Sequence, residues 1–453
     1  MTAPSLIFEP LTIKGVEFRS RVFRSSIGGR YAYYDGAVNP AWAHFERRFA
    51  AHGVGAIISA TITVNDRRWS PIEYPKISQD RFIKPIRAGV RAVQQLGCRY
   101  ILQIGDPGYH TQAGLFSERA DEMSASSGFD MFFGYRSRRS AMTVGEIEQA
   151  VEDFAQAARR VREAGCDGVE ITASKGYLIH QFLNPAVNRR QDRYGGSVEK
   201  RFQFLKEIVA AVRNRVGPDF LFGIRLSARD YNYTPIDIRW PPVFPLRHWW
   251  FGNDLPETLE YARRLKALGV DYLHVSNGFG FINPKENPGD GYPAREIRIF
   301  FNSIRHLSRK AAVRATLVNS IPLPLLRRLV AIGWRYEQGA NLPDAAVFRR
   351  EVGLPVIANG GFQQRSFIER ALTSGSCDVV AMARPLLANV DLLDQFRAGR
   401  DLPELPCTFC NRCTVRTTVG PLGCYEPKRF ASEDEMEAQI LTWSAPPDTT
   451  EYS

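Results

Sequence analysis

Residues 144–173, VGEIEQAVEDFAQAARRVREAGCDGVEITA, join a helical pattern directly to a strand pattern. From Val144 to Val161, apolar residues recur every three or four positions, which is the spacing of one face of a helix, and Gly165 stands where such a helix would end. The run GVEITA that follows lacks the polar alternation of a strand with one wet face. The segment therefore predicts a helix followed by a strand that is covered on both faces.

The same unit recurs along the whole chain. Seven other short runs are rich in Val and Ile, and the helical period returns at 201–215 and 257–268. The seven runs are RVFRSSI (21–27), GAIISAT (55–61), RYILQIG (99–105), LFGIRLS (221–227), DYLHVS (271–276), PVIANGG (355–361) and DVVAMAR (378–384). Eight strands with helices between them are typical of an α/β fold of the (β/α)₈ TIM barrel type. The alternative is an open doubly wound sheet, but no GxGxxG follows the first run.

The barrel is expected to occupy residues 1–400, with a helical insertion at about 280–352 after the sixth strand. Residues 295–350 hold eleven of the basic residues and only three acidic ones, so this insertion is strongly basic. The loop at 228–252 is rich in Pro and aromatic residues and lies where barrel enzymes place substrate loops. Residues 401–453 form a short extension that contains four cysteines and ends in a polar tail.

Composition excludes several classes of protein. The 453 residues are 44% hydrophobic and carry a net charge of +11, which suits a globular chain with a large core. No run reaches the roughly 18 apolar residues of a membrane span, and the first residues lack the pattern of a secretory leader. An odd total of seven cysteines argues against a disulfide framework. A cytoplasmic protein, and a homo-oligomer, is expected.

The basic segment at 295–350 admits three interpretations. Its apolar runs, IRIFFNSI and IPLPLLRRLVAIGW, are bracketed by Arg and Lys. Such helices can lie peripherally on an anionic membrane, cover an active site or form a subunit interface. No nucleic-acid partner is expected.

The segment EITASKGYLIHQFLNPAVNRRQDRYGGSVEKR, residues 170–201, carries the most specific pattern. Its elements GYL, HQFLNP and NRR-x-D-x-YGGS-x-E-x-R resemble the flavin mononucleotide (FMN) barrels of the old yellow enzyme family (NADH:flavin oxidoreductases), in the branch of 2,4-dienoyl-CoA reductase and trimethylamine dehydrogenase. The resemblance extends from FEPLTIKG (8–15) to the cysteines. It implies an enzyme in which NAD(P)H, or a partner protein, reduces FMN, which then passes a hydride to an unsaturated carbonyl-type small molecule.

The resemblance also implies which residues hold FMN. Gln103 would offer its amide to the pyrimidine edge, and Arg225 would place a fixed positive charge beside N1 and the C2 carbonyl. Gly360, Gly361 and Arg384 would bind the phosphate. The remaining cofactor-binding positions are Ser25, Ser26, Ala60 and Ala383.

The implied catalytic residues are Tyr177, Lys175 and Thr172. Tyr177 matches the tyrosine that delivers a proton, and a phenol with a pKa near 10 is a donor at neutral pH. Thr172 and Lys175 stand where the family usually has His and His or Asn, so the substrate site differs from the family pattern. His180 is expected to be packed and hydrogen-bonded rather than catalytic. The alternative function is an electron-transfer or scaffold subunit that keeps FMN without independent turnover.

Four cysteines follow the barrel with the spacing C-x₂-C-x₂-C-x₁₀-C, at Cys407, Cys410, Cys413 and Cys424. Thiolates bind both iron and zinc, so the spacing leaves an iron–sulfur cluster, a zinc site and free thiols open. The resemblance favours a [4Fe-4S] cluster. The chain ends soon after Cys424, so the pyridine-nucleotide domain of the long family members is not expected, and electrons would come from NAD(P)H at the flavin or from a separate partner.

Overall fold

The computed structural model describes residues 5–29, 31–68, 75–110, 122–130, 137–232, 252–280, 283–285, 287–307, 309–417 and 419–444. Eight parallel strands form a closed ring, and the pairing of β6 with β10 closes it. The strands are β3 (Val22–Arg24), β4 (Ala56–Ile58), β6 (Arg99–Gly105), β10 (Gly168–Ala173), β11 (Leu221–Ser227), β12 (Tyr272–Ser276), β13 (Val356–Ala358) and β14 (Val379–Met382). All eight predicted runs form these strands, so the (β/α)₈ barrel is confirmed and the open sheet was the wrong alternative.

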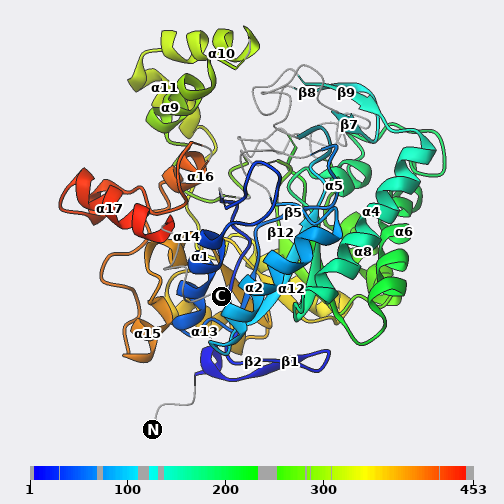
Figure 1. Ribbon diagram of the computed structural model, residues 1–453, viewed down its shortest axis with the longest axis horizontal. Coiled ribbons are helices and arrows are strands. Elements are labelled where there is room, and N and C mark those ends of the chain that lie inside the picture. Colours follow the sequence, from blue (N-terminus) through cyan, green and yellow to red (C-terminus); the bar gives the residue numbers. More distant parts are fainter. Residues whose placement is uncertain are drawn as a thin grey trace.

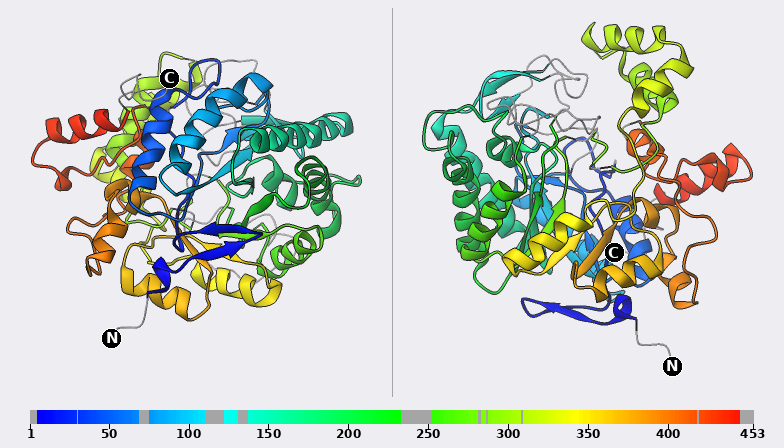
Figure 2. Two further views of the ribbon diagram at one scale, coloured as in Figure 1. Left: turned by 60° about the horizontal axis from the view of Figure 1, so that its bottom comes forward. Right: turned by 180° about the vertical axis from the view of Figure 1, so that it is seen from behind.

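Helices surround the ring (Figures 1 and 2). They include α1 (Pro40–Ala51), α2 (Ile83–Gln94), α4 (Val144–Glu163), α6 (Val198–Val216), α8 (Leu255–Ala267), α12 (Leu342–Val352) and α13 (Arg365–Thr373). The longest of these, α4, begins at a capping box in which Thr143 and Glu146 bond each other's backbone N–H. None of the described helices is long and apolar enough to cross a membrane.

A hairpin of β1 (Leu11–Ile13) and β2 (Val16–Phe18) covers one end of the barrel (Figure 2). Its side chains Ile13 and Phe18 pack with residues that begin the barrel strands, among them Leu221 and Val379. This hairpin therefore closes the amino-terminal end of the strands. The carboxyl ends, where barrel enzymes place their sites, face the opposite side.

Three helices stand apart from the barrel and form a feature that we call the arm: α9 (Ala294–Ile304), α10 (Arg309–Ser320) and α11 (Leu323–Ala331). In Figures 1 and 2 the arm projects well beyond the ring of helices. The insertion was predicted to extend to about residue 352, but α12 packs against α8, β12 and β13 as a helix of the barrel does. Of the predicted loop at 228–252, residues 233–251 lie outside the described residues, as does the polar tail from residue 445.

The barrel interior holds a buried carboxylate. Glu170, in the middle of β10, is fully buried and lies opposite Gln103 in the pairing with β6. Its oxygens accept hydrogen bonds from Gln103 Nε2 (2.6 Å), Tyr272 OH (3.2 Å) and His274 Nδ1 (3.2 Å). Although burial alone would raise it, contacts with His274, Arg225 and Gln103 hold the pKa of Glu170 below its usual value.

Gly223 leaves the space that the Tyr272 side chain needs to reach this carboxylate. Gly223 lies on β11, directly between Glu170 and Tyr272 in the strand register. A Cβ atom at this position would stand 2.0 Å from the Tyr272 ring. Only glycine therefore lets the ring cross β11 and place its hydroxyl on Glu170.

His274 is neutral in this buried group, which we call the layer and which consists of Gln103, Glu170, Tyr272 and His274. Asn359 Nδ2 lies 3.1 Å from His274 Nε2 and donates to it, so the ring proton is on Nδ1 and points to Glu170. Burial lowers the pKa of His274, which agrees with a neutral ring.

These shifts predict a loss of stability in acid. His274 and Glu170 have folded-state pKa values below their usual 6.5 and 4.5, so their contribution is complete above pH 6.5 and is lost as pH falls through the lowered values. We expect the urea midpoint to fall from pH 7 to pH 4. Glu170→Gln should cost about 3–5 kcal/mol at pH 7, since it removes one partner of a buried charge, and should flatten the decline below pH 4.5. An unchanged acid slope in this variant would contradict the assignment.

Candidate functional site

The carboxyl ends of β3, β4 and β6 bring together a connected set of polar groups. Gln103 is 1% exposed, and its Oε1 accepts hydrogen bonds from Ser26 Oγ (3.0 Å) and from Thr61 Oγ1. Ser25 lies beside them and donates its backbone N–H to Met382 O of β14 (2.9 Å). The structure thus places predicted cofactor residues of the first and third barrel strands in contact, and it adds Thr61, which the sequence reasoning missed.

Two cations face the same interior layer. Arg225 is 3% exposed at the end of β11 and pairs in register with Thr172 of β10 on one side and His274 of β12 on the other. The charges of Arg225 and of the half-buried Lys175 both lower the pKa of His274, although burial is the larger cause. Both cations therefore lie close enough to His274 to disfavour its charged form.

A tight turn after β10 carries the predicted catalytic residues. Lys175 has φ of +58° and Gly176 has φ of +75°, so both lie in the left-handed region. Tyr177 follows as the N-cap of α5 (Leu178–Leu183) and is 3% exposed. A non-glycine residue held in this region indicates that surrounding contacts impose the turn.

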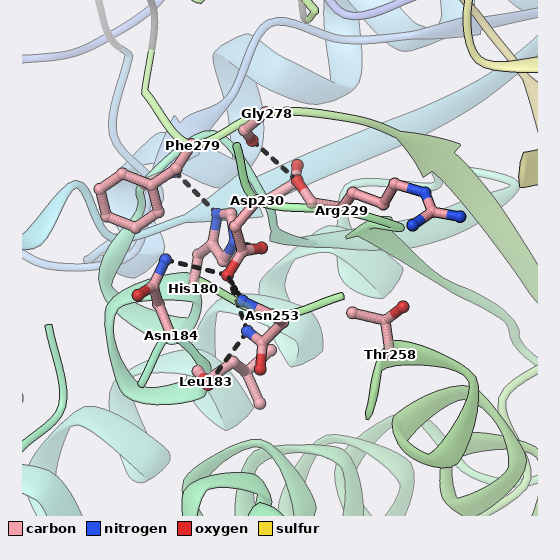
Figure 3. A network of polar contacts seen from close by, with 12 residues as sticks. His180, Leu183, Asn184, Arg229, Asp230, Asn253, Thr258, Gly278 and Phe279 are labelled. Carbon is pink, nitrogen blue, oxygen red and sulfur yellow. Dashed lines mark hydrogen bonds and ion pairs between the residues drawn. The ribbon is translucent and has the colours of Figure 1, made fainter. Parts of the chain in front are cut away.

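His180 and Asp230 hold the turn from one side, and Figure 3 shows these two side chains together with Asn184 and Asn253. Gly176 N donates to His180 Nδ1 (3.0 Å), so the ring proton is on Nε2 and is donated to Asp230 Oδ1 (2.7 Å). Asp230 Oδ2 also accepts from Asn184 Nδ2 (2.9 Å) and from the backbone and side-chain nitrogens of Asn253 (2.7 and 2.8 Å). The expectation that His180 is packed and hydrogen-bonded is confirmed, and its bonds position the Lys175–Tyr177 turn.

A buried ion pair supports the turn from the other side. Arg68 Nη2 lies 2.6 Å from Asp106 Oδ2, and both side chains are almost completely buried. The Asp106 carboxylate accepts from Gly108 N (2.8 Å), and its backbone oxygen accepts from Leu178 N (2.8 Å) at the start of the Tyr177 helix. Arg68 and Asp106, which we call the Asp106 clamp, thus hold the start of α5 beside Tyr177.

The predicted phosphate turn follows β13. Gly360 and Gly361 have φ of +112° and +76°, and a Cβ atom on Gly361 would stand 2.8 Å from the Glu337 carbonyl oxygen. Glycine is therefore required there, and a glycine pair at positive φ suits an anion. Tyr336 OH donates to Gly361 O (3.0 Å).

Arg384, which begins α14 (Arg384–Ala388), points toward the cysteine extension. Its Nη1 donates to Pro288 O (2.9 Å) and to Asn411 Oδ1, and its guanidinium lies 5.0 Å from the centre of the Phe409 ring. Phe409 in turn stacks on Tyr336, with ring centres 4.3 Å apart. Arg384 and the Tyr336–Phe409 stack therefore connect the glycine turn with the cysteines.

The four predicted metal ligands, Cys407, Cys410, Cys413 and Cys424, line one pocket. Its other lining residues are Arg384, Leu387, Thr408, Phe409, Asn411, Tyr425 and Glu426. Within the described parts of the chain, no three His, Cys, Asp or Glu side chains stand in a metal-binding arrangement. The structure thus gathers the thiols in one place without a formed ligand set.

The local backbone nevertheless suits thiolates. Phe409 N donates to Cys407 Sγ (3.4 Å), and the N–H groups two residues after Cys410 and Cys424 bond those sulfurs in the same way. Burial raises the pKa of Cys407 to about 12, against the lowering effect of Arg384 and this N–H. The sulfurs are therefore thiols at neutral pH unless a metal displaces their protons.

Several site residues were not predicted from the sequence, because their roles depend on partners that are distant in the chain. Glu170 and His274 gave the clearest signal, since each is a polar residue inside an otherwise apolar run. Asp230, Tyr336 and Asn359 gave none.

Comparison with known proteins identifies the family. A family model described as NADH:flavin oxidoreductase / NADH oxidase family matches residues 6–239. An NADPH dehydrogenase of Bacillus subtilis is 31% identical over 63% of this chain and 77% of its own length. An NADH oxidase of Thermoanaerobacter brockii is 26% identical over 92% of this chain, and the match spans 57% of that protein.

The fold agrees with these matches. A solved complex of 2-naphthoyl-CoA reductase superimposes with a TM-score of 0.73 at 22% identity, over 92% of this chain and 56% of the other. The chain thus spans little more than half the length of the reductase and of the NADH oxidase. On its sequence, its barrel and the residues at the carboxyl ends of its strands, the chain belongs to the NADH:flavin oxidoreductase / NADH oxidase family.

Proposed function

We propose that this protein is an FMN-dependent oxidoreductase that uses NAD(P)H, or an electron-transfer partner, to reduce an unsaturated carbonyl-type substrate. Bound FMN would supply the chemistry by accepting a hydride and passing it to the substrate. The main evidence for this proposal is a group of potential hydrogen-bond donors at the carboxyl ends of the barrel strands. It combines the buried amide of Gln103, the buried guanidinium of Arg225 and the turn of Gly360 and Gly361. We assign the barrel to residues 1–400 and the cysteine extension to 401–453.

Different residues of this chain would hold the ring and the phosphate of FMN. The Gln103 amide has a second N–H beyond the one that it donates to Glu170, which would face the flavin, and Arg225 would hold a positive charge against the electron-rich edge of the ring. Gly360 and Gly361 would offer backbone N–H groups to the phosphate, and Arg384 would add its positive charge. Ser25, Ser26, Ala60 and Ala383 would line the cofactor chiefly with backbone.

Tyr177 would hold the proton that the reduced substrate requires. Phenols keep their proton at neutral pH, and the turn that His180 fixes determines where this hydroxyl stands. Lys175 and Arg225 concentrate positive charge at the mouth, which favours a carboxylate or a strongly polarised carbonyl. Thr172 is 1% exposed and pairs in register with Arg225. Its hydroxyl is a weaker hydrogen-bond donor than the histidine that the family usually has there.

A second candidate function is electron transfer through an iron–sulfur cluster at the cysteines. It is favoured by four thiols in one pocket, of which three receive backbone N–H bonds. Such a cluster would draw its ligands from Cys407, Cys410, Cys413 and Cys424. Arg384 would place a positive charge beside them, which stabilises thiolates.

The first prediction from this proposal concerns cofactor retention. The purified protein should be yellow and release FMN on denaturation. Arg225→Ala and Arg384→Ala should each weaken FMN binding about tenfold or more, since a charged hydrogen bond contributes about 1.5–3 kcal/mol. Fluorescence titration of the apoprotein measures this, with the exposed Arg350→Gln as the control. A folded protein that cannot be reconstituted with FMN would refute the proposal.

The second prediction separates the two halves of turnover. Tyr177→Phe should slow substrate reduction by about 100-fold or more, because general acid catalysis contributes that much, and leave reduction of the bound flavin by NADPH nearly unchanged. Rapid mixing under anaerobic conditions measures each half separately.

His180→Phe is the matched variant for the turn, since it keeps a ring but loses the acceptor for Gly176 N. It should raise the substrate KM as well as slow substrate reduction, because Lys175 and Tyr177 move together. An equal loss of both half-reactions in Tyr177→Phe would indicate a structural tyrosine.

The third prediction concerns the cysteines. Protein purified without oxygen should contain iron and acid-labile sulfide, and replacing any one of the four pocket cysteines by Ser should lower both. Cys98→Ala and Cys377→Ala change buried cysteines outside the pocket and should leave the content unchanged. If the protein instead contains stoichiometric zinc and no sulfide, electron transfer through a cluster is refuted and the cysteines form a structural metal site.

A further inference from the structure

The arm combines exposed aliphatic side chains with exposed arginines. Val313 and Leu317 lie one turn apart on α10, and Leu325 and Leu329 lie one turn apart on α11. These four side chains are between 47% and 60% exposed. Ile332 directly follows α11 and is 45% exposed. Each pair forms an exposed apolar stripe on its helix, and exposed apolar patches mark interaction surfaces.

The charge of the arm has one sign. Between Gly291 and Tyr336 the chain contains a single carboxylate, Glu296, against nine basic residues. Glu296 is buried and lies 3.7 Å from Arg412 of α16 (Arg412–Arg416), so it is directed away from solvent. Exposed arginines follow α9, begin α10 and lie within α11, namely Arg305, Arg309, Arg327 and Arg328. The arm therefore presents concentrated positive charge that no carboxylate of its own balances.

The arm has a small hydrophobic core that joins it to α16, and α10 projects away from the barrel. Phe300 and Ile304 of α9 pack with Ala311 of α10 and Val415 of α16 in a small core of their own. Arg298 Nη2 also donates to Ile321 O, which ties α9 to the connection between α10 and α11. Figures 1 and 2 show α10 at the end of the arm farthest from the barrel, so a flat surface can reach it without meeting the ring of helices.

These observations favour an anionic bilayer as the occupant. A second copy of this chain would bring two arms of the same positive charge together, which is unfavourable. A lid over the site would need α10 near the barrel mouth, whereas it lies at the far end of the arm. Short helices with Leu and Val among arginines match a lipid interface, where the aliphatic groups enter the acyl boundary and the arginines meet phosphates.

We propose that the arm, α9–α11, docks this protein on anionic phospholipid membranes. Val313, Leu317, Leu325 and Leu329 enter the interface, and the surrounding arginines bind lipid phosphates. This proposal is independent of the flavin chemistry, because it uses no residue of the barrel mouth.

Sedimentation of the full chain with vesicles tests the proposal. We expect binding to phosphatidylcholine vesicles that contain phosphatidylglycerol and little binding to phosphatidylcholine alone. The variant with Arg305, Arg309, Arg327 and Arg328 changed to Gln should bind at least about 100-fold more weakly, since each arginine near an anionic surface contributes about fivefold. Leu325→Asn with Leu329→Asn should also weaken binding at physiological salt.

Matched variants control for net charge and for surface hydrophobicity. Changing Arg81, Arg193, Arg350 and Arg400 to Gln removes four exposed arginines outside the arm, and Leu402→Asn with Leu405→Asn removes two exposed leucines elsewhere. Both controls should bind as the wild type does. Absence of wild-type binding to the anionic vesicles, or equal loss in the controls, would overturn the proposal.

Discussion

A single buried carboxylate constrains the interior of this barrel. Glu170 can stay charged only because two other strands supply donors to it, from Gln103 on β6 and from Tyr272 and His274 on β12. These contacts hold the register of β6, β10, β11 and β12, since a shift of one residue would turn each donor away. Gly223 is part of the same constraint, because any side chain there would block Tyr272.

The mouth of the barrel is built upon this layer. Gln103 contacts Glu170 through its nitrogen and meets Ser26 and Thr61 through its oxygen, so the layer also orients the groups above it. The turn with Tyr177 is held separately, by His180 on one side and by the Asp106 clamp on the other. Turn and layer therefore depend on different contacts, so the residues predicted to bind substrate can differ from the family pattern while those predicted to bind FMN are kept.

The extension and the arm are physically connected. Val415 of α16 packs into the core of the arm, and Cys410 and Cys413 flank the start of this helix. Arg384 connects the same pocket with the barrel through Asn411 and the Phe409 ring. Helix α16 therefore contacts both the arm and the cysteine pocket. The arm, the cysteine pocket and the predicted phosphate turn thus belong to one continuous structure.

By itself, the amino-acid sequence determined the eight strands, because short apolar runs between helical periods report local burial. Its motifs also located Gln103, Arg225 and the 175–177 turn. Only the tertiary structure decided which residues hold them. Glu170 meets His274, and His180 meets Asp230, across distances of 104 and 50 residues in the chain. Local patterns record whether a side chain is buried but not which distant side chain it meets, so hydrogen-bonded pairs and the direction of Arg384 emerge only when the strands are closed into a ring.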